Sequence, residues 1–168
     1  LTADHIIQPQ DEFARCIDIG FDLVEADSSR MVTFGITPTE PSTAYGYVEL
    51  GDAIGEGAFA CKRFVEKPDR ETAEQYLASN QFAWNSGMFV FHAGTFLEAM
   101  NRMHAESAAK LGEIGEAWGT NTQQEVIERV YPTLPKISVD YGMMEPASID
   151  EAISICTVPM AVSWLDVG

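Results

Sequence analysis

The stretch Met31-Val-Thr-Phe-Gly-Ile36 is a short and mostly apolar run. Such a run is typical of a strand that is buried on both faces of a sheet. The segment 10–26 before it carries apolar residues at helical spacing, and Pro9 suits the start of a helix. Residues 1–3 have the character of the end of another strand. A helix between two such strands is a βαβ unit, which predicts an α/β protein with a parallel sheet.

The chain after this unit alternates further strands and helices. Segments 44–50 and 58–65 flank a glycine-rich turn, which predicts an antiparallel hairpin. Segment 82–91 is predicted to be a strand, and segment 153–158 is predicted to be another because of its β-branched residues. We find no linker, internal repeat or low-complexity tract, so residues 1–168 are expected to form one domain.

Several apolar stripes at helical spacing are expected to belong to the core. Asp69 can cap a helix whose inner face starts at Ala73, and Thr122-Gln-Gln-Glu125 has the pattern of a capping box. The stripes consist of Ala73, Tyr76 and Leu77; Phe96, Ala99, Met100 and Met103; Leu111, Ile114 and Trp118; and Val126, Ile127, Val130 and Tyr131.

The stretch Arg63-Phe-Val-Glu-Lys-Pro-Asp69 places opposite charges at the end of a predicted strand. Pro68 ends this strand because proline has no N–H to donate to a ladder. Groups at the carboxyl ends of strands in an α/β sheet face the crevice where ligands bind. There the carboxylate of Glu66 can bind sugar hydroxyls and the ammonium of Lys67 can bind a phosphate. The alternative is a surface ion pair at a strand–helix junction.

Length and charge exclude several classes of partner. A chain of 168 residues is long enough for one domain with a sizeable core. Its net charge of −16 argues against a nucleic-acid partner, which requires clustered Lys and Arg. An acidic enzyme can still bind phosphorylated small molecules if Mg²⁺ supplies positive charge. No apolar run approaches the roughly 18 residues of a membrane span, and no signal peptide is visible, so no membrane partner is expected.

The cysteines and the chain ends suggest a cytoplasmic protein of which this is one part. Cys16, Cys61 and Cys156 are widely spaced and form no C-x-x-C pair, which favours reduced, buried thiols over a disulfide framework or a zinc site. The chain starts at Leu1 without an initiator Met and stops at Gly168 after a strand-like segment. We therefore expect a domain that is truncated at both ends.

Six segments in this order resemble one family of enzymes. They are Thr33–Pro38, Pro41–Tyr47, Phe64–Pro68, Trp84–Phe91, Ser138–Gly142 and Trp164–Gly168. Together the segments resemble the mannose-1-phosphate guanylyltransferases, also called GDP-mannose pyrophosphorylases, of the sugar nucleotidyltransferase superfamily. The resemblance covers nearly the whole chain.

This resemblance implies a fold and a reaction. The fold is a Rossmann-like, GT-A-like nucleotidyltransferase domain, here incomplete, with a mixed and mostly parallel sheet and flanking helices. The reaction converts GTP and mannose 1-phosphate to GDP-mannose and pyrophosphate with Mg²⁺ as cofactor. Both substrates are anionic, so catalysis depends mostly on positioning and charge neutralisation.

The resemblance also implies a role for individual residues. Asp4 and Asp166 correspond to Mg²⁺ ligands, and Asp166 and Lys67 are the expected catalytic residues. On the substrate side, Gly46 is expected to offer a backbone group to the sugar, Glu66 and Asn85 to hold sugar hydroxyls, Lys67 to contact the sugar phosphate, and Asp140 to lie near the sugar.

Each of these residues has a simpler structural interpretation as well. Asp4 and Asp166 can be ordinary turn or helix-capping residues, and Asn85-Ser-Gly87 can be a bulge in a strand. His5, His92 and His104 form no metal-binding pattern and are expected to be structural or exposed.

Two other functions stay open. The glycine-rich, Arg-containing loop that holds the GTP phosphates in the family has no equivalent in this sequence, so a non-catalytic relative that binds sugar nucleotide is one alternative. The other is a metal-dependent glycosyltransferase, although Asp18-Ile-Gly-Phe-Asp22 does not match the Asp-x-Asp motif of that class. We expect the chain alone to be inactive, and we expect an unpaired sheet edge to favour a homo-oligomer.

Overall fold

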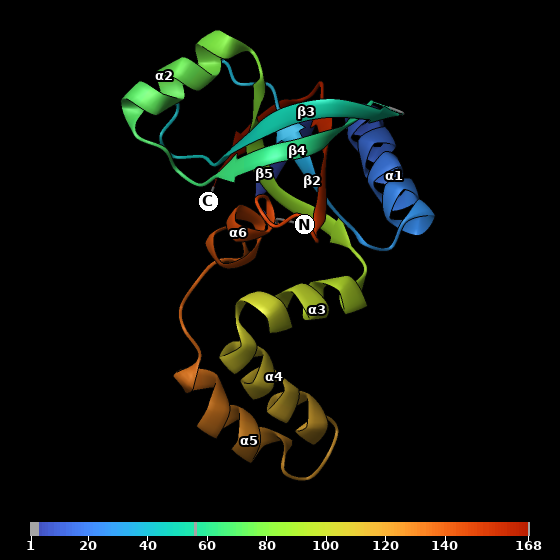
Figure 1. Cartoon of the computed structure of the whole chain (residues 1–168), viewed down its shortest axis with the longest axis vertical. Helices are drawn as coiled ribbons and strands as arrows, with labels where there is room; N and C mark the ends of the chain where they lie inside the picture. The colour runs from blue at the N-terminus through green and yellow to red at the C-terminus, as the bar shows by residue number, and fades with distance from the viewer. Residues whose placement is uncertain (1–3, 56, 168) are drawn as a thin grey trace.

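A computed structural model describes residues 4–55 and 57–167, and a five-stranded sheet forms its centre (Figure 1). Strand β2 (Arg30–Ile36) lies between two partners, β5 (Phe82–Phe91) and β6 (Ser154–Met160). It pairs antiparallel with β5 and parallel with β6. The strand that was predicted from 31–36 is therefore confirmed.

The predicted hairpin is also confirmed, and it closes the sheet on itself. Strands β3 (Tyr47–Gly55) and β4 (Ala58–Val65) pair antiparallel. β3 also pairs antiparallel with β5, and β4 pairs antiparallel with β6. The strand order β2-β5-β3-β4-β6 thus ends where it began.

The sheet is mixed and flanked by helices, as expected, but it is not mostly parallel. Of its five strand pairings only β2–β6 is parallel. The expectation was wrong because the hairpin β3–β4 and the strand β5 fill the positions that parallel crossover strands take in a βαβ fold.

Within the described residues, the strand before the first helix does not belong to the sheet that contains β2, so it does not form the predicted βαβ unit with it. Helix α1 occupies Gln10–Ala26, as predicted, but β1 (His5–Gln8) before it pairs antiparallel with β7 (Ser163–Asp166). β1 and β7 form a separate two-stranded sheet. The strand end that we expected at residues 1–3 lies outside the described residues, and Asp4 directly precedes β1.

Both faces of β2 are buried, which explains its apolar sequence. Successive residues of a strand point to opposite faces. Val32 and Phe34 join the core beneath α1, whereas Met31 joins a second core with residues of α3 (Ala93–Met103). All three side chains are fully buried.

The remaining helices lie in two groups. α2 (Arg70–Ser79) follows β4, and the side chain of Asp69 caps it by accepting from the N–H of Thr72 at 2.8 Å, as predicted. Figure 1 shows α3, α4 and α5 extending away from the sheet on the side opposite α2. In this second group, α3 is followed by α4 (Ala105–Ala117) and α5 (Gln123–Val130). The chain then forms the 3₁₀ turn η1 (Tyr131–Thr133), the π-helical turn η2 (Asp140–Met144) and α6 (Glu145–Ala147).

Some expected core and capping residues are exposed or unused. Trp118 and Tyr131 are 67% and 65% exposed. Each lies at the C-terminal end of a helix, α4 and α5 respectively, in the group of helices that extends away from the sheet. Thr122 precedes α5, but its hydroxyl makes no cap bond to the helix and lies 3.0 Å from the hydroxyl of Thr120 instead. The prediction of a capping box at residues 122–125 was therefore wrong.

The packing of β2 predicts which glycine cannot be replaced. A Cβ at Gly35 would lie 2.6 Å from the Cβ of Ala83 and 3.1 Å from Cγ2 of Thr157, both in neighbouring strands. We expect Gly35→Ala to lower the free energy of unfolding by about 1–3 kcal/mol in a denaturant titration. Gly112→Ala is the control, because a Cβ there meets nothing within 4 Å and alanine favours the helix. Equal stability of the two variants would contradict this packing.

Candidate functional site

The small sheet β1–β7 brings together acidic residues from the two ends of the chain. His5 and Asp166 are directly paired across it, and the N–H of Val167 donates to the carbonyl of Asp4 at 3.1 Å. One candidate ligand atom from each of Asp4, His5 and Asp166 lies within 4.8 Å of the others. The two carboxylates that were expected to share an ion are therefore close in space.

Trp164 determines how His5 takes part in this cluster. The indole N–H of Trp164 donates to Nδ1 of His5 at 3.0 Å, and the two rings pack edge to face. A neutral imidazole that accepts at Nδ1 carries its proton on Nε2. Nε2 lies 3.6 Å from Asp166 Oδ1 and 4.0 Å from Asp4 Oδ1. His5 thus presents a proton, rather than a lone pair, to the carboxylates.

This arrangement suits a hard cation. Carboxylate oxygens from Asp4 and Asp166 are the ligands that Mg²⁺ prefers, and Mg²⁺ usually keeps water for its other positions. A protonated Nε2 cannot bind a metal, but a histidine N–H beside ligating carboxylates can orient them. The donor set therefore fits Mg²⁺ through two carboxylates.

A row of aromatic rings leads from this cluster to a second group of polar residues. The ring of Trp164 packs on Tyr45 with centroids 4.9 Å apart, and Tyr45 packs on Trp84 at 5.2 Å. Gly46 and Asn85 follow Tyr45 and Trp84 in sequence, and the N–H of Asn85 donates to the carbonyl of Gly46 at 2.8 Å.

Glu66 is the buried carboxylate of this second group. Its side chain is 9% exposed, and Oε1 lies 3.8 Å from the ammonium of Lys67. Oε2 is buried and has no hydrogen-bond partner in the described part of the chain. A Cβ at position 46 would clash with Oε2, so any other residue there would require the Glu66 carboxylate to move. A buried acceptor without a donor is costly, and a ligand hydroxyl would satisfy it.

The surroundings of Glu66 shift the pKa of its carboxyl upward. Burial raises the pKa of the Glu66 carboxyl above its ordinary value, and the nearby carboxylates of Asp140 and Glu145 raise it further. The ammonium of Lys67 lowers this pKa, with a smaller effect than burial or Asp140 and a larger one than Glu145.

Asn85 lies behind the site and connects four parts of the fold. Its Oδ1 accepts from the N–H of Gly87 at 3.1 Å and from the hydroxyl of Thr33 at 3.2 Å. Because a backbone N–H can only donate, these contacts orient the amide, and Nδ2 donates to Asp140 Oδ1 at 2.8 Å. Asn85 is only 8% exposed, and its hydrogen bond positions the carboxylate of Asp140. Asn85 also lies close to Gly46.

An open cavity of about 590 Å³ lies over this group, within the size range of small-ligand sites. It contains three of the residues singled out in the sequence, Glu66, Lys67 and Asp140. Lys67 has a φ of 47°, a left-handed conformation that is uncommon for a residue with a side chain. Gly46 and Asn85 adjoin Glu66 and Asp140 but do not line the cavity. Its other lining residues are Lys136, Ile137, Ser138 and Tyr141.

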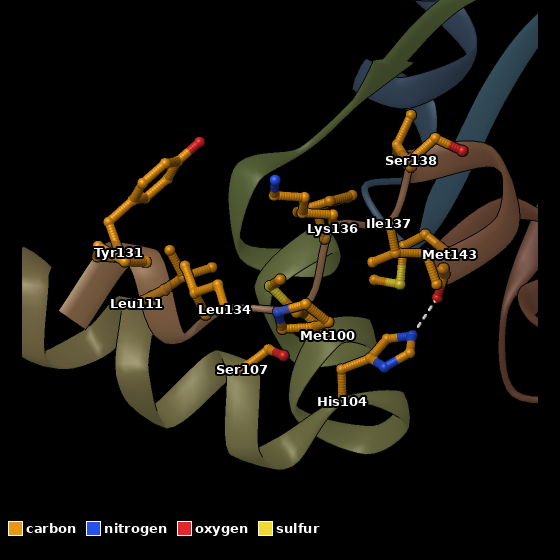
Figure 2. A pocket seen from close by; sticks show the side chains of 15 residues that line it. Met100, His104, Ser107, Leu111, Tyr131, Leu134, Lys136, Ile137, Ser138 and Met143 are labelled. Atoms are coloured by element: carbon orange, nitrogen blue, oxygen red, sulfur yellow. Dashed lines mark hydrogen bonds between the residues drawn. The ribbon is translucent and has the colours of Figure 1, made fainter.

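Sequence reasoning missed these four residues, although they flank Asp140. Ser138 and Tyr141 lie in the segment Ser138–Gly142 of the family resemblance but were given no role, and no motif marked Lys136 or Ile137, because the segment 136–141 has neither helical nor strand periodicity. The same segment borders a second, mostly apolar hollow of about 500 Å³ against α3 and α4. Figure 2 shows this hollow, with Met100 and Leu111 from the helices and Ile137 from the connecting chain.

The other polar residues of interest have structural roles. Nδ1 of His92 accepts from the N–H of Gly94 at the start of α3. A ring nitrogen of His104 hydrogen-bonds to the carbonyl of Gly142 (Figure 2). The three cysteines are free thiols, of which Cys16 and Cys156 are buried. No helix in the described residues is long and apolar enough to cross a membrane.

The chain combines a mixed sheet and flanking helices with an acidic cluster that suits a cation and a cavity lined by both carboxylates and lysines. This combination is consistent with an enzyme that binds phosphorylated small molecules. Residues 1–168 match the family model described as nucleotidyl transferase. The chain belongs to the nucleotidyl transferase family.

Individual relatives have similar sequences over the whole chain. It is 38% identical over 173 residues to mannose-1-phosphate guanylyltransferase from Escherichia coli K12 and 37% identical over 171 residues to the xanthan biosynthesis protein XanB from Xanthomonas campestris. Each alignment covers all of this chain. The chain spans only about a third of the length of these curated relatives, 35% and 34% respectively.

Solved structures support the same fold. The structure of mannose-1-phosphate geranyltransferase from Thermus thermophilus superposes with a TM-score of 0.78 at 31% identity, covering 99% of this chain and 45% of that one. Mannose-6-phosphate isomerase from Helicobacter pylori gives a TM-score of 0.76 at 26% identity, covering 98% of this chain and 61% of that one.

The raised pKa of Glu66 predicts a pH-dependent stability. Native Glu66 binds its proton more tightly than the unfolded chain does, so the free energy of unfolding falls as pH rises from about 4.5 through the folded pKa. Glu66→Gln cannot titrate and lacks this fall. Denaturant titrations from pH 4 to 8 should show the variant gaining stability relative to the unsubstituted chain as pH rises. Glu71→Gln, an exposed site on α2, is the control, and a constant difference for Glu66→Gln would contradict the burial of its charge.

The acidic cluster predicts a cation site that depends on both carboxylates. We expect Asp166→Asn to weaken Mn²⁺ binding, used as a probe for Mg²⁺, by roughly tenfold or more, because one of two charged ligands is lost. Mn²⁺ binding is measured by electron paramagnetic resonance or calorimetry. Asp11→Asn, on the exposed first turn of α1, is the matched control. Equal affinities for both variants would exclude Asp166 as a ligand.

Proposed function

We propose that the protein carrying this chain is a mannose-1-phosphate guanylyltransferase. In this reaction a phosphate oxygen of mannose 1-phosphate attacks the α-phosphorus of GTP, the bond from the α-phosphorus to the bridging oxygen breaks, and pyrophosphate leaves. The observation that carries the proposal is the buried, unpartnered Oε2 of Glu66 beside Lys67 in an open cavity. The names of the similar curated relatives, and the mannose phosphates in the names of both structural relatives, support the choice of substrate.

The sugar side of the site is assigned to Glu66 and Asp140. Both carboxylates border the cavity and can accept hydrogen bonds from adjacent hydroxyls of a hexose ring. The amide of Asn85 fixes the orientation of Asp140, and the absence of a side chain at Gly46 leaves space at Glu66. A hexose with a hydroxyl in the wrong orientation leaves one buried acceptor unpaired, which gives the site its selectivity.

Phosphate binding is assigned to Lys67 and cation binding to Asp4 and Asp166. The ammonium of Lys67 lies beside Glu66, so a sugar held by Glu66 has its phosphate within reach of a positive charge. Mg²⁺, held by the two carboxylates, would neutralise the phosphates of the substrates. His5 and Trp164 keep these carboxylates oriented. The aromatic row from Trp164 to Trp84 fixes the position of the cation cluster relative to the sugar cavity.

The direct test is product formation by the protein that contains this chain. It is incubated with Mg²⁺, GTP and mannose 1-phosphate, and GDP-mannose is identified by chromatography and mass spectrometry. Parallel reactions contain glucose 1-phosphate in place of the mannose compound, or UTP in place of GTP. We expect GDP-mannose to form fastest. A product formed only from another sugar or another nucleotide would contradict the proposed substrates, and no product from any pair would contradict the enzyme.

Removal of Lys67 should separate the two substrates. We expect Lys67→Ala to raise the KM for mannose 1-phosphate about ten- to a hundredfold, since a charge-assisted contact contributes about 1.5–3 kcal/mol, and to leave the KM for GTP nearly unchanged. Arg70→Ala is the control, because it removes a nearby charge whose side chain is 71% exposed. Equal losses for both substrates would mean that Lys67 supports the fold or the nucleotide.

A further inference from the structure

Lys136 is a cation of the cavity that no sequence motif marks. It borders the same cavity as Lys67, Glu66 and Asp140. Within residues 4–55 and 57–167, eight Lys or Arg side chains form ion pairs with carboxylates, and Lys62 and Lys136 form none. In a chain of net charge −16, an unpaired ammonium on the wall of a cavity is available for an anionic ligand.

Lys67 alone does not balance the negative charge of the cavity walls and of a bound phosphate. Lys67 is already 3.8 Å from Glu66, and Asp140 adds a second carboxylate to the same walls. A sugar phosphate brings a group with about two negative charges. One lysine that is paired with a carboxylate does not balance these charges, whereas a second, unpaired lysine reduces the repulsion.

The backbone around Lys136 holds it at this place. Pro135 restricts the chain before it, and the N–H of Ile137 donates to the carbonyl of Pro135 at 3.1 Å. After it, the N–H of Gly142 donates to the carbonyl of Ser138 at 2.9 Å, which ties the segment to η2. The side chain of Ile137 packs closely on Gly142.

The stem and the head of Lys136 have different surroundings. Lys136 also lines the apolar hollow of Figure 2, together with residues such as Leu134 and Met143. Lysine commonly packs its aliphatic stem on apolar surface and keeps its ammonium at a polar boundary. Lys136 lies between an apolar hollow that can receive its stem and a cavity bordered by charged side chains that can receive its ammonium.

We propose that Lys136 is a second phosphate-binding residue, which holds the phosphate of the sugar 1-phosphate together with Lys67. The sugar's identity rests on the function proposed above, whereas the role of Lys136 requires only a phosphorylated ligand in this cavity. Lys136 approaches from the 136–141 segment and Lys67 from the end of β4, so the phosphate is bound between two separate parts of the fold.

The test compares Lys136→Ala with Lys62→Ala in the protein that contains this chain. Both variants lose one unpaired lysine, but Lys62 is on β4 and does not line the cavity. Calorimetry measures the affinities for mannose 1-phosphate, glucose 1-phosphate and mannose. We expect Lys136→Ala to weaken binding of the preferred sugar phosphate about tenfold and to leave mannose binding unchanged. Lys136→Arg should recover most of the affinity, and Lys62→Ala should match the unsubstituted protein.

Three results would overturn the proposal. An unchanged affinity of Lys136→Ala for the sugar phosphate would remove Lys136 from the site. An equal loss for mannose and its phosphate, not recovered by Lys136→Arg, would show a structural role. Failure of the unsubstituted protein to bind either sugar phosphate would contradict both this role and the proposed enzyme. A preference for glucose 1-phosphate, with the same tenfold loss on substitution, would reject the mannose assignment and keep Lys136 as a phosphate ligand.

Discussion

The buried amide of Asn85 is the interaction on which the cavity beside Glu66 and Asp140 depends. Its Oδ1 is committed to Gly87 and Thr33 and its Nδ2 to Asp140, while its backbone N–H donates to Gly46. β2, β5, the loop before β3 and the turn η2 therefore meet at one residue that is 8% exposed. Loss of Asp140 would leave Nδ2 of this buried residue without that acceptor, so the network resists rearrangement. A cavity bordered by Asp140 and adjoining Gly46 acquires a fixed shape from this network.

The two charged clusters of the structure are held in place by different interactions. At the edge of the small sheet, backbone pairing of β1 with β7 places Asp4 and Asp166 together, and Trp164 sets the tautomer of His5 between them. In the cavity, Glu66 is held at low exposure, and one of its oxygens has no donor among the described residues. Burial and neighbouring carboxylates raise the pKa of its carboxyl. The proposed function assigns a cation to the first cluster and hydroxyl donors and a phosphate to the second. These preferences match the parts of a sugar phosphate bound with a divalent metal.

The sequence predicted the local elements well because each had a strong local cause. Helix α1 has apolar periodicity and Pro9 at its start, and Asp69 caps α2 through its own side chain. The direction of strand pairing has no such local cause: β1 has a helix after it, as in a βαβ unit, yet its partner β7 lies at the other end of the chain. The candidate residues Asp4, Asp166, Glu66 and Lys67 were found through motifs, whereas Lys136 was not. Its position follows from how the 136–141 segment folds beside Glu66 and Lys67, which come directly after β4, and no periodicity encodes this.

The most direct measurement is a crystal structure of the protein that contains this chain with mannose 1-phosphate and Mn²⁺, whose anomalous scattering identifies the metal. The account predicts an anomalous peak bound by the carboxylates of Asp4 and Asp166, within about 2.1–2.3 Å of the oxygens that ligate it. It also predicts hexose hydroxyls at hydrogen-bond distance from Glu66 and Asp140. A sugar phosphate bound in the apolar hollow between α3 and α4, or a metal on other residues, would contradict the account.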